Sequence, residues 1–158
     1  MPTVYSSKDN SPIDLDALKG IAVLVTVPAA FSGTCTSACI PSILENLRAI
    51  KDAGASRIIV VSTDQPHAMN EWIRIAKWKN EDIEFASDFD QFEVRQMIGK
   101  LGEEKGKEKL PPPLAGLLRR SYSVLHDGKV VWQFIEPDTT QYTLQPEDLV
   151  GAVRKARG

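Results

Sequence analysis

The sequence predicts an α/β fold in which helices flank a central mixed β-sheet, and three features support this prediction. Residues 21–27 and 57–62 are apolar runs of strand length, which is typical of parallel strands that are buried on both faces. The amphipathic pattern of residues 41–53 predicts a helix between them, and this order of elements gives a right-handed parallel unit. Asp127 and Gly128 separate two alternating apolar runs, which is a strong hairpin signal.

The chain before the first central strand is only weakly patterned. Residues 1–14 are polar and contain turn formers, so we expect either a short edge strand or a loose lead-in. Asp14 is placed to cap a short turn that runs to Leu18 and ends at Gly20. The first central strand follows directly, from Ile21.

Smaller elements are expected around the central strands. They are a helix over 68–78, a short strand over 83–86, a short helix over 92–98, hairpin strands over 120–125 and 129–135, and a last helix that starts near Pro146. Residues 99–118 combine mixed charges with glycines and prolines, which is typical of a solvated surface excursion. A lid over a site is the alternative interpretation of this segment.

Length and composition restrict the class of protein. With 158 residues the chain is expected to form a single domain, residues 1–158, with a substantial core. A formal net charge of −2 offers no basic surface for nucleic acid or an anionic membrane, and no apolar run is long enough to span a membrane. The first residues lack a signal-peptide pattern, and the only two cysteines lie too close together to form a disulfide framework. We therefore expect a cytoplasmic protein in a reducing environment, without nucleic-acid or membrane partners.

The reactive residue types gather in residues 27–41, where both cysteines lie. The first central strand enters this stretch and a helix leaves it, so Cys35 is delivered to the start of a helix. Backbone N–H groups at a helix N-terminus favour a thiolate over a thiol, and the hydroxyls of Thr34 and Thr36 can hydrogen-bond a substrate. We therefore predict that Cys35 is a nucleophile, with a small buried core residue as the alternative.

These residues resemble the active-site motif of the peroxiredoxins. Pro28, Ser32 and Cys35 form the pattern Pro-x-x-x-Ser-x-x-Cys, and the surrounding stretch is most similar to the type-5, or redoxin, branch. The similarity spans residues 20–156. Its further parts are Ser62 followed by Glu71-Trp72, residues 85–92, Arg120 eight positions before Gly128, and Glu136-Pro137-Asp138.

The resemblance implies a thioredoxin-like fold and a thiol peroxidase that reduces hydrogen peroxide and alkyl hydroperoxides without a metal or organic cofactor. Cys35 would attack the peroxide as a thiolate and become a sulfenic acid, the first step of cysteine oxidation. Ser32 would hydrogen-bond the peroxide and the thiolate, Arg120 would stabilise the thiolate and the developing charge, and Pro28 would shield the site from water. A guanidinium suits this role because it stays charged and favours a nearby anion.

The resemblance also implies a homodimer that is recycled by thioredoxin or by glutaredoxin/glutathione. Many relatives carry a second, resolving cysteine, but residues 1–34 and 139–158 contain none, so Cys39 is the only internal candidate. One helical turn would place the Cβ atoms of Cys35 and Cys39 about 5–6 Å apart, beyond the usual separation of about 3.8 Å in a disulfide. A disulfide would therefore require the first turn to unwind, which Pro41 makes easier. Resolving and packing roles for Cys39 both remain open.

Other assignments compete with these. Arg119 lies beside Arg120, and alternation along a strand turns only one of the two inward. Ser32 could be only a turn residue, Asp64 could be polar lining, and Trp72 and Phe92 are expected in the core or an interface. His67 and His126 do not form a usual zinc spacing with the cysteines.

Two other functions are kept as alternatives to the peroxidase. One is a thiol–disulfide oxidoreductase or redox sensor on the same fold, which would react with peroxide only slowly. The other is a non-catalytic interaction module, in which the charged excursion over 99–113 binds a partner. An unreactive Cys35 thiol would favour the second alternative.

Overall fold

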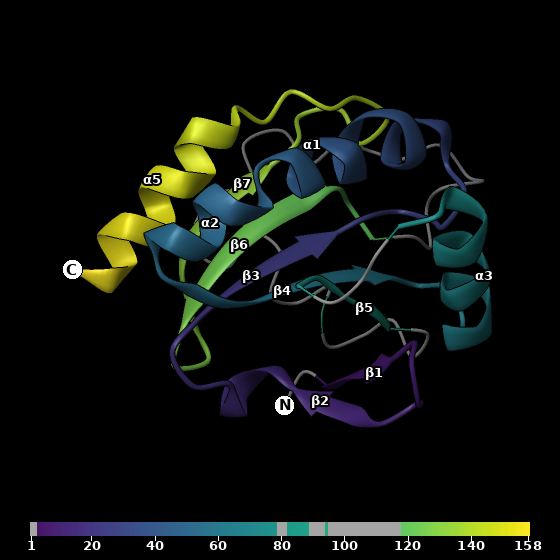
Figure 1. The fold of residues 1–158 in the computed structure, drawn as a ribbon, viewed down its shortest axis with the longest axis horizontal. Coiled ribbons are helices and arrows are strands. Elements are labelled where there is room, and N and C mark those ends of the chain that lie inside the picture. The colour runs from purple at the N-terminus through teal and green to yellow at the C-terminus, as the bar shows by residue number, and fades with distance from the viewer. Residues whose placement is uncertain (1–2, 79–81, 89–93, 95–117) are drawn as a thin grey trace.

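The computed structural model describes residues 3–78, 82–88, 94 and 118–158, and a seven-stranded mixed sheet organises this part of the chain (Figure 1). Its strands are β1 (Thr3–Ser6), β2 (Pro12–Asp14), β3 (Ile21–Thr26), β4 (Ala55–Ser62), β5 (Glu84–Ser87), β6 (Ser121–His126) and β7 (Lys129–Ile135). Its helical segments are η1 (Leu15–Ala17), η2 (Cys35–Cys39), α1 (Ile40–Glu45), α2 (Leu47–Ala53), α3 (Pro66–Ala76) and α5 (Pro146–Arg157). The strands lie in the order β2-β1-β5-β4-β3-β6-β7.

The predicted parallel unit forms the centre of this sheet. β3 runs parallel to β4, with Val23 opposite Ile58, and β5 adds a third parallel strand on the far side of β4. On its other edge β3 pairs antiparallel with β6, which in turn forms the predicted hairpin with β7. The α/β prediction with a central mixed sheet is therefore confirmed.

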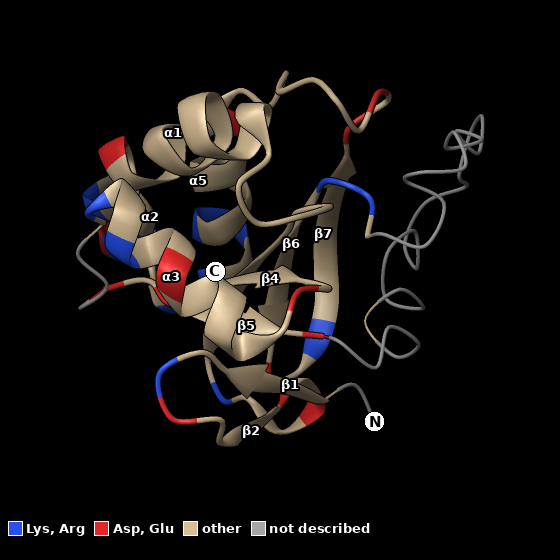
Figure 2. Ribbon diagram, turned by 90° about the vertical axis from the view of Figure 1, so that its right-hand side faces the viewer, with Lys and Arg blue, Asp and Glu red and all other residues tan. Residues whose placement is uncertain are grey.

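Each face of the sheet carries its own hydrophobic core. Val23 and Val25 of β3 belong to the core under α1, α2, α3 and α5, whereas Ala22 and Leu24 belong to the core on the opposite face. Because side chains alternate along a strand, this double burial explains why β3 is apolar at every position up to Thr26. Figure 2 shows the charged residues mainly on helices and loops around the uncharged middle of the sheet.

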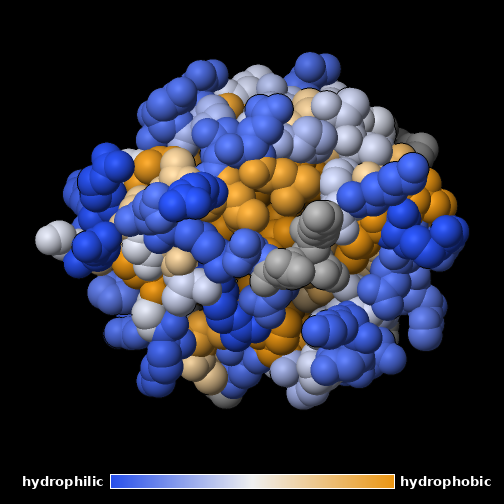
Figure 3. Space-filling view, in the orientation of Figure 1, coloured by the Kyte–Doolittle hydropathy of each residue, from blue (hydrophilic) through white to orange (hydrophobic). Residues whose placement is uncertain are grey.

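Some apolar residues also reach the surface. Figure 3, in the orientation of Figure 1, shows them gathered in the middle of this face, between α2 and α3. Leu47 of α2 and Trp78, just after α3, are only partly buried where they pack against the core. Within the described residues, no helix combines the length and the apolar character that crossing a membrane requires.

The helix expected over 41–53 begins earlier and is divided. A π-helical turn, η2, precedes α1, and Asn46 separates α1 from α2 with backbone angles of φ −101° and ψ 7°. Pro41 has no N–H to donate to the fourth residue before it, so regular α-helical bonding fails there. The wider turn is closed one residue earlier by the N–H of Ile40, which donates to the carbonyl of Cys35.

The N-terminal residues form an edge hairpin, which settles the choice left open by their sequence. β1 pairs antiparallel with β2 and with β5, so the hairpin extends the sheet beyond the parallel strands. As predicted, the Asp14 side chain accepts a hydrogen bond from the Asp16 N–H and caps the short η1 turn. Gly20 follows in a left-handed conformation with φ 72°.

The remaining predicted elements are placed within a few residues. α3 begins two residues before the expected helix, β5 lies one residue after the expected strand, and α5 begins at Pro146 with Glu147 and Asp148 in its first turn. The helix expected over 92–98 and the excursion over 99–118 lie outside the described residues, apart from Val94 and Leu118, which are both buried.

Candidate active site

The carboxyl end of β3 leads into the loop that carries the site. Val27 and Pro28 are buried, and the chain then reaches the surface at Phe31, which has a left-handed φ of 63°. Ser32 follows as a helix cap, because its Oγ accepts a hydrogen bond from the Cys35 N–H at 3.3 Å. The motif residues Pro28, Ser32 and Cys35 are thus positioned by one strand end and one helix start, as the sequence predicts.

Cys35 is fully buried, and its thiol contacts a cation. The Arg120 Nη1 donates a hydrogen bond to the Cys35 Sγ at 2.9 Å, and the Arg120 Nε donates to the Thr139 carbonyl at 3.1 Å. Burial alone would lower the pKa of Arg120, but the sulfurs of Cys35 and Cys39 outweigh it and raise that pKa above its usual range. The guanidinium therefore stays charged next to the thiol.

Sheet pairing explains how two residues so far apart in sequence meet. The register places Thr26, the last residue of β3, opposite Ser121, the first residue of β6. Cys35 follows β3 and Arg120 directly precedes β6, so both lie at the same end of the sheet. Arg119 is only partly buried, and its Nη2 donates to the Glu136 carbonyl at 3.2 Å instead.

Two hydrogen bonds fix the helix turn around Cys35. The Thr34 Oγ1 donates to the Thr140 carbonyl at 2.7 Å, and the Trp72 Nε1 donates to the Thr36 Oγ1 at 3.0 Å. Trp72 is 1% exposed and packs edge-on against the ring of Phe85, in line with its predicted place in the core. The two threonines that flank Cys35 therefore connect its helix to the loop before α5 and to α3.

The loop after β4 supports the loop after β3. The Asp64 Oδ2 accepts hydrogen bonds from the Ala30 N–H at 2.6 Å and from the Ser62 Oγ at 2.8 Å. The Thr63 Oγ1 donates to the Pro28 carbonyl at 3.5 Å. Asp64, expected only as polar lining, thus fixes the backbone between Pro28 and the helix cap.

Behind Cys35 lies a second polar group, built from Cys39, Tyr122 and Glu136. The Cys39 Sγ is 3.8 Å from the Tyr122 Oη, which donates to the Glu136 Oε2 at 3.0 Å. All three side chains are fully buried. Burial raises the pKa of the Cys39 thiol to about 11, although the charge of Arg120 opposes this shift.

Sequence reasoning did not assign a role to Tyr122 or Glu136. Tyr122 stands in the inward-facing register of β6 with Val124, so its sequence position is that of an ordinary core residue. Glu136 stands out in the sequence only as part of the Glu-Pro-Asp segment that resembles the family. The available signal was a carboxylate directly after an apolar strand, next to Pro137.

The other candidate residues lie elsewhere. His67 and His126 are exposed, and Phe92 lies outside the described residues. Among the residues that the structure describes, no three His, Cys, Asp or Glu side chains are grouped so that they could hold a metal ion.

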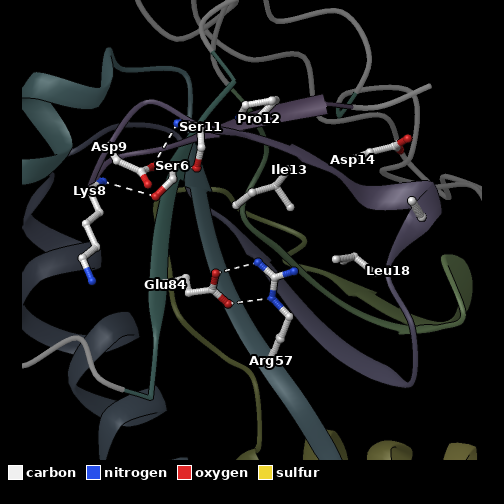
Figure 4. Close-up of a pocket in the computed structure, with 11 residues that line it drawn as sticks. Ser6, Lys8, Asp9, Ser11, Pro12, Ile13, Asp14, Leu18, Arg57 and Glu84 are labelled. Carbon is white, nitrogen blue, oxygen red and sulfur yellow. Dashed lines mark hydrogen bonds and ion pairs between the residues drawn. The ribbon is translucent and has the colours of Figure 1, made fainter.

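A large open pocket is present at a different place. Figure 4 shows it beside the β1–β2 hairpin, where Arg57 of β4 and Glu84 of β5, two inner strands of the sheet, face each other below the loop around Lys8. The Arg57 Nε and Nη2 donate to the two Glu84 carboxylate oxygens at 2.8 and 2.6 Å. Neither Cys35 nor Arg120 lines this pocket, so it is separate from the candidate active site.

The Redoxin family model matches residues 1–152. The chain belongs to the Redoxin family. Its similar relatives are named peroxiredoxins: Peroxiredoxin AHP1 of Chaetomium thermophilum is 30% identical over 129 residues, which cover 79% of this chain and 67% of the relative. A putative peroxisomal peroxiredoxin of Lipomyces kononenkoae is 29% identical over 132 residues, covering 81% of this chain and 74% of the relative.

Solved peroxiredoxin structures have the same fold. The crystal structure of reduced Prx3 from Vibrio vulnificus in complex with H2O2 matches with a TM-score of 0.75 at 19% identity, over 96% of this chain and 89% of that chain. The chain is thus a peroxiredoxin of the thioredoxin fold, which confirms the family and the fold predicted from the motif. Peroxiredoxins are thiol peroxidases, so the predicted enzyme class is confirmed as well.

Proposed function

We propose that Cys35 is the peroxidatic cysteine of this peroxiredoxin and that its thiolate reduces hydrogen peroxide and alkyl hydroperoxides. The contact of 2.9 Å between the Arg120 Nη1 and the Cys35 Sγ is the observation that carries the proposal. A charged donor at this distance in a buried site stabilises an anionic sulfur far more than it would in water. The Vibrio vulnificus relative was crystallised with H2O2, which supports the choice of substrate.

The reaction follows from this geometry. The Cys35 thiolate attacks one peroxide oxygen, so that an S–O bond forms while the O–O bond breaks. Sulfur is oxidised to a sulfenic acid, and the other oxygen leaves as hydroxide or alkoxide and takes a proton to become water or an alcohol. Negative charge moves from sulfur to the leaving oxygen, and the Arg120 guanidinium is placed to stabilise it throughout.

Ser32 and Pro28 complete the proposed site. Ser32 uses its oxygen as the acceptor for the Cys35 N–H, so its hydroxyl proton is available to a bound peroxide oxygen. Pro28 is buried at the end of β3, and its ring adds apolar surface beside the loop that carries Ser32. Such surface excludes water, which strengthens the electrostatic interactions inside the site.

Replacing the Cys35 sulfur tests this proposal. Cys35→Ser keeps the size of the side chain but removes the nucleophile, so we expect peroxide consumption to be lost. Turnover is measured with a ferrous-iron peroxide assay, and folding of the variant is checked by circular dichroism and thermal unfolding. Peroxide turnover by a folded Cys35→Ser protein would refute the assignment.

The proposed reductant is thioredoxin or the glutaredoxin/glutathione system. The sulfenic acid must be returned to the thiolate by thiols, and both systems supply them. Coupled assays that follow NADPH oxidation with each purified system separate the two reductants.

A cytoplasmic site of action is part of the same proposal and is supported by two free thiols, Cys35 and Cys39, which a reducing compartment preserves. The Lipomyces relative is named as peroxisomal, so cell fractionation is the direct test.

The proposed assembly is a homodimer of a single domain, residues 1–158. Among the described residues, three large hydrophobic side chains are exposed: Phe31 at 49%, Ile75 at 55% and Val131 at 46%. The ring of Phe31 lies 6.4 Å from that of Trp72 in α3, the helix that also carries Ile75. Phe31 in the active-site loop and Ile75 in the neighbouring α3 are thus both exposed, and a second copy of the chain that covers them would bury this apolar surface.

A further inference from the structure

The polar group behind Cys35 is a continuous hydrogen-bonded chain from Cys39 through Tyr122 to Glu136. It connects η2, β6 and the segment after β7. The peroxide reaction proposed above uses Cys35 and Arg120 and gives no role to Cys39, Tyr122 and Glu136. Burial of these polar groups costs free energy unless each is hydrogen-bonded. The positions of their protons therefore show which group donates and which accepts.

The direction of each hydrogen bond in the chain is fixed from the Glu136 end. The carboxylate accepts from the N–H of Thr143 at 2.8 Å, from the N–H of Leu144 at 3.2 Å and from the Thr143 Oγ1. Backbone N–H groups can only donate, so Glu136 is held as an acceptor. Tyr122 has one proton and gives it to Glu136, which leaves the Tyr122 oxygen to accept the S–H of Cys39.

The charged and titratable groups around Cys39 are compatible with donation from Cys39 to Tyr122 and from Tyr122 to Glu136. Cys35 lies on the same helix, Arg120 and Tyr122 come from the β6 side, Glu136 from the segment after β7, and Tyr142 from the loop before α5. The Arg120 Nη1 is bound to the Cys35 Sγ. Arg120 interacts with both thiols, but their surroundings differ: the Arg120 Nη1 donates to the Cys35 Sγ, whereas Cys39 also has beside it the Tyr122 oxygen, to which its S–H can be donated.

We infer that Tyr122 and Glu136 hold Cys39 as a protonated thiol, so that the Cys35 sulfenic acid is recycled by an external thiol and not by Cys39. This inference rests on the proposed peroxidatic role of Cys35. Backbone geometry agrees with it, because a Cys35–Cys39 disulfide would require the π-helical turn closed by the Ile40 N–H and the Cys35 carbonyl to open. Tyr122 and Glu136 act through Cys39 and are positioning residues.

The cycle then needs two external thiols. The first attacks the sulfenic sulfur, so that an S–S bond forms and the S–O bond breaks, and the proton of the attacking thiol leaves with the hydroxyl as water. The second thiol attacks this mixed disulfide, which returns Cys35 to the thiol state and releases an external disulfide. A low-molecular-weight thiol or a protein thiol satisfies this chemistry.

Intact mass spectrometry tests the inference on the complete chain. Reduced wild type and Cys39→Ser are each treated with one equivalent of H2O2, with and without a sulfenic-acid trap. We expect both proteins to gain one oxygen atom and to form the trapped adduct. A loss of two hydrogen atoms in wild type that disappears in Cys39→Ser would overturn the inference. Masses that stay unchanged in both proteins would instead refute the peroxidatic role of Cys35.

The infrared S–H stretch tests the positioning role of Tyr122. At neutral pH, wild type should show one S–H band, and Cys39→Ser should show none, since the proposed function requires Cys35 to react as a thiolate. In Tyr122→Phe, which retains the ring, the band should move to higher frequency since its hydrogen-bond acceptor is gone. No band in wild type, or a band that Tyr122→Phe leaves in place, would contradict the inference. A band that persists in Cys39→Ser would count against the proposed thiolate at Cys35.

Discussion

The Arg120 side chain brings a permanent positive charge into the core and donates hydrogen bonds to two acceptors. One guanidinium nitrogen contacts the Cys35 sulfur and another contacts the Thr139 carbonyl, with only 1% of the residue exposed. The planar guanidinium makes the two contacts with two separate nitrogens, whereas an ammonium carries its three donors on one nitrogen and cannot reproduce this geometry. The geometry of the cation, and not only its charge, should therefore determine the rate.

Arg120→Lys tests the importance of this geometry. We expect the second-order rate constant for H2O2 to fall by about a hundredfold, as when one fixed donor to a developing charge is removed. Competition kinetics against a heme peroxidase measures the constant. Arg119→Lys is the matched control, because it makes the same change one position away, and it should retain the wild-type rate. Equal effects in the two variants would contradict a specific role for Arg120.

The Cys39 thiol gives a separate prediction about pH. Its pKa is raised from 9.0 to about 11 in the folded protein, so between these values the folded state keeps a proton that the unfolded chain releases. Stability falls with rising pH when the folded state binds more protons. We expect the wild type to lose about 1 kcal/mol more of its free energy of unfolding than Cys39→Ser when the pH rises from about 8 to 10. Parallel urea titrations of the two proteins at each pH measure this difference, and equal slopes would contradict it.

At the residue scale, the sequence predicts the local part of the site and misses the part assembled by folding. Pro28, Ser32 and Cys35 are close in sequence, and the Arg120 position follows from its spacing to Gly128. Tyr122 and Glu136 could not be assigned, because their significance comes from pairing across β6 and β7, with the carboxylate turned inward toward Thr143. A single sequence does not show which core tyrosine meets a buried carboxylate.

At the scale of elements, periodic patterns were sufficient for the central strands and the amphipathic helices. β3, β4 and the β6–β7 hairpin lie close to their predicted ranges, because their burial imposes a regular apolar pattern. The start of the Cys35 helix was not predictable in the same way. Its π-helical turn depends on Pro41 and on the Ile40 N–H bonding to the Cys35 carbonyl, which leaves no hydrophobic period in the sequence.

Two glycines, one in the β6–β7 turn and one in α5, should respond in opposite ways to replacement by alanine. Gly128 closes the β6–β7 hairpin with φ 81°, and a Cβ there would collide with the Asp16 carbonyl. Gly128→Ala should lower the free energy of unfolding by about 2 kcal/mol or more. Gly151 lies inside α5 with open space around it, so Gly151→Ala should raise that free energy by about 0.5–1 kcal/mol. Urea unfolding measures both, and a stabilised Gly128→Ala would show that the turn is not constrained as described.

At the scale of the whole molecule, two hydrophobic cores on opposite faces of the sheet hold the strand ends in place. The loop that carries the site therefore starts from buried strand ends, where β3 and β4 finish. The sequence indicated this placement, because ligands in open α/β sheets bind at the carboxyl ends of parallel strands. It could not indicate which surface meets a partner, since exposed apolar residues are only recognised once the fold is known.

The proposed homodimer is tested by placing a charge in the apolar surface that contains Phe31 and Ile75. Phe31→Glu should shift the molecule from dimer to monomer in sedimentation-velocity experiments, because it places a carboxylate in the apolar surface beside the active-site loop. Val131→Glu makes the same change on β7, at the sheet edge, and should leave the dimer intact. Dissociation by Val131→Glu alone would place the interface at the β7 edge, and a monomeric wild type would refute the dimer.

The register of β3 against β6 also determines where Cys35 and Arg120 meet. Cys35 and Arg120 are 85 positions apart in the sequence, and the pairing of Thr26 with Ser121 places them at the same end of the sheet. During synthesis on the ribosome, Cys35 is added to the chain 85 residues before Arg120. The nascent protein therefore carries the Cys35 thiol without its guanidinium partner until the β6 segment has been made and has paired with β3.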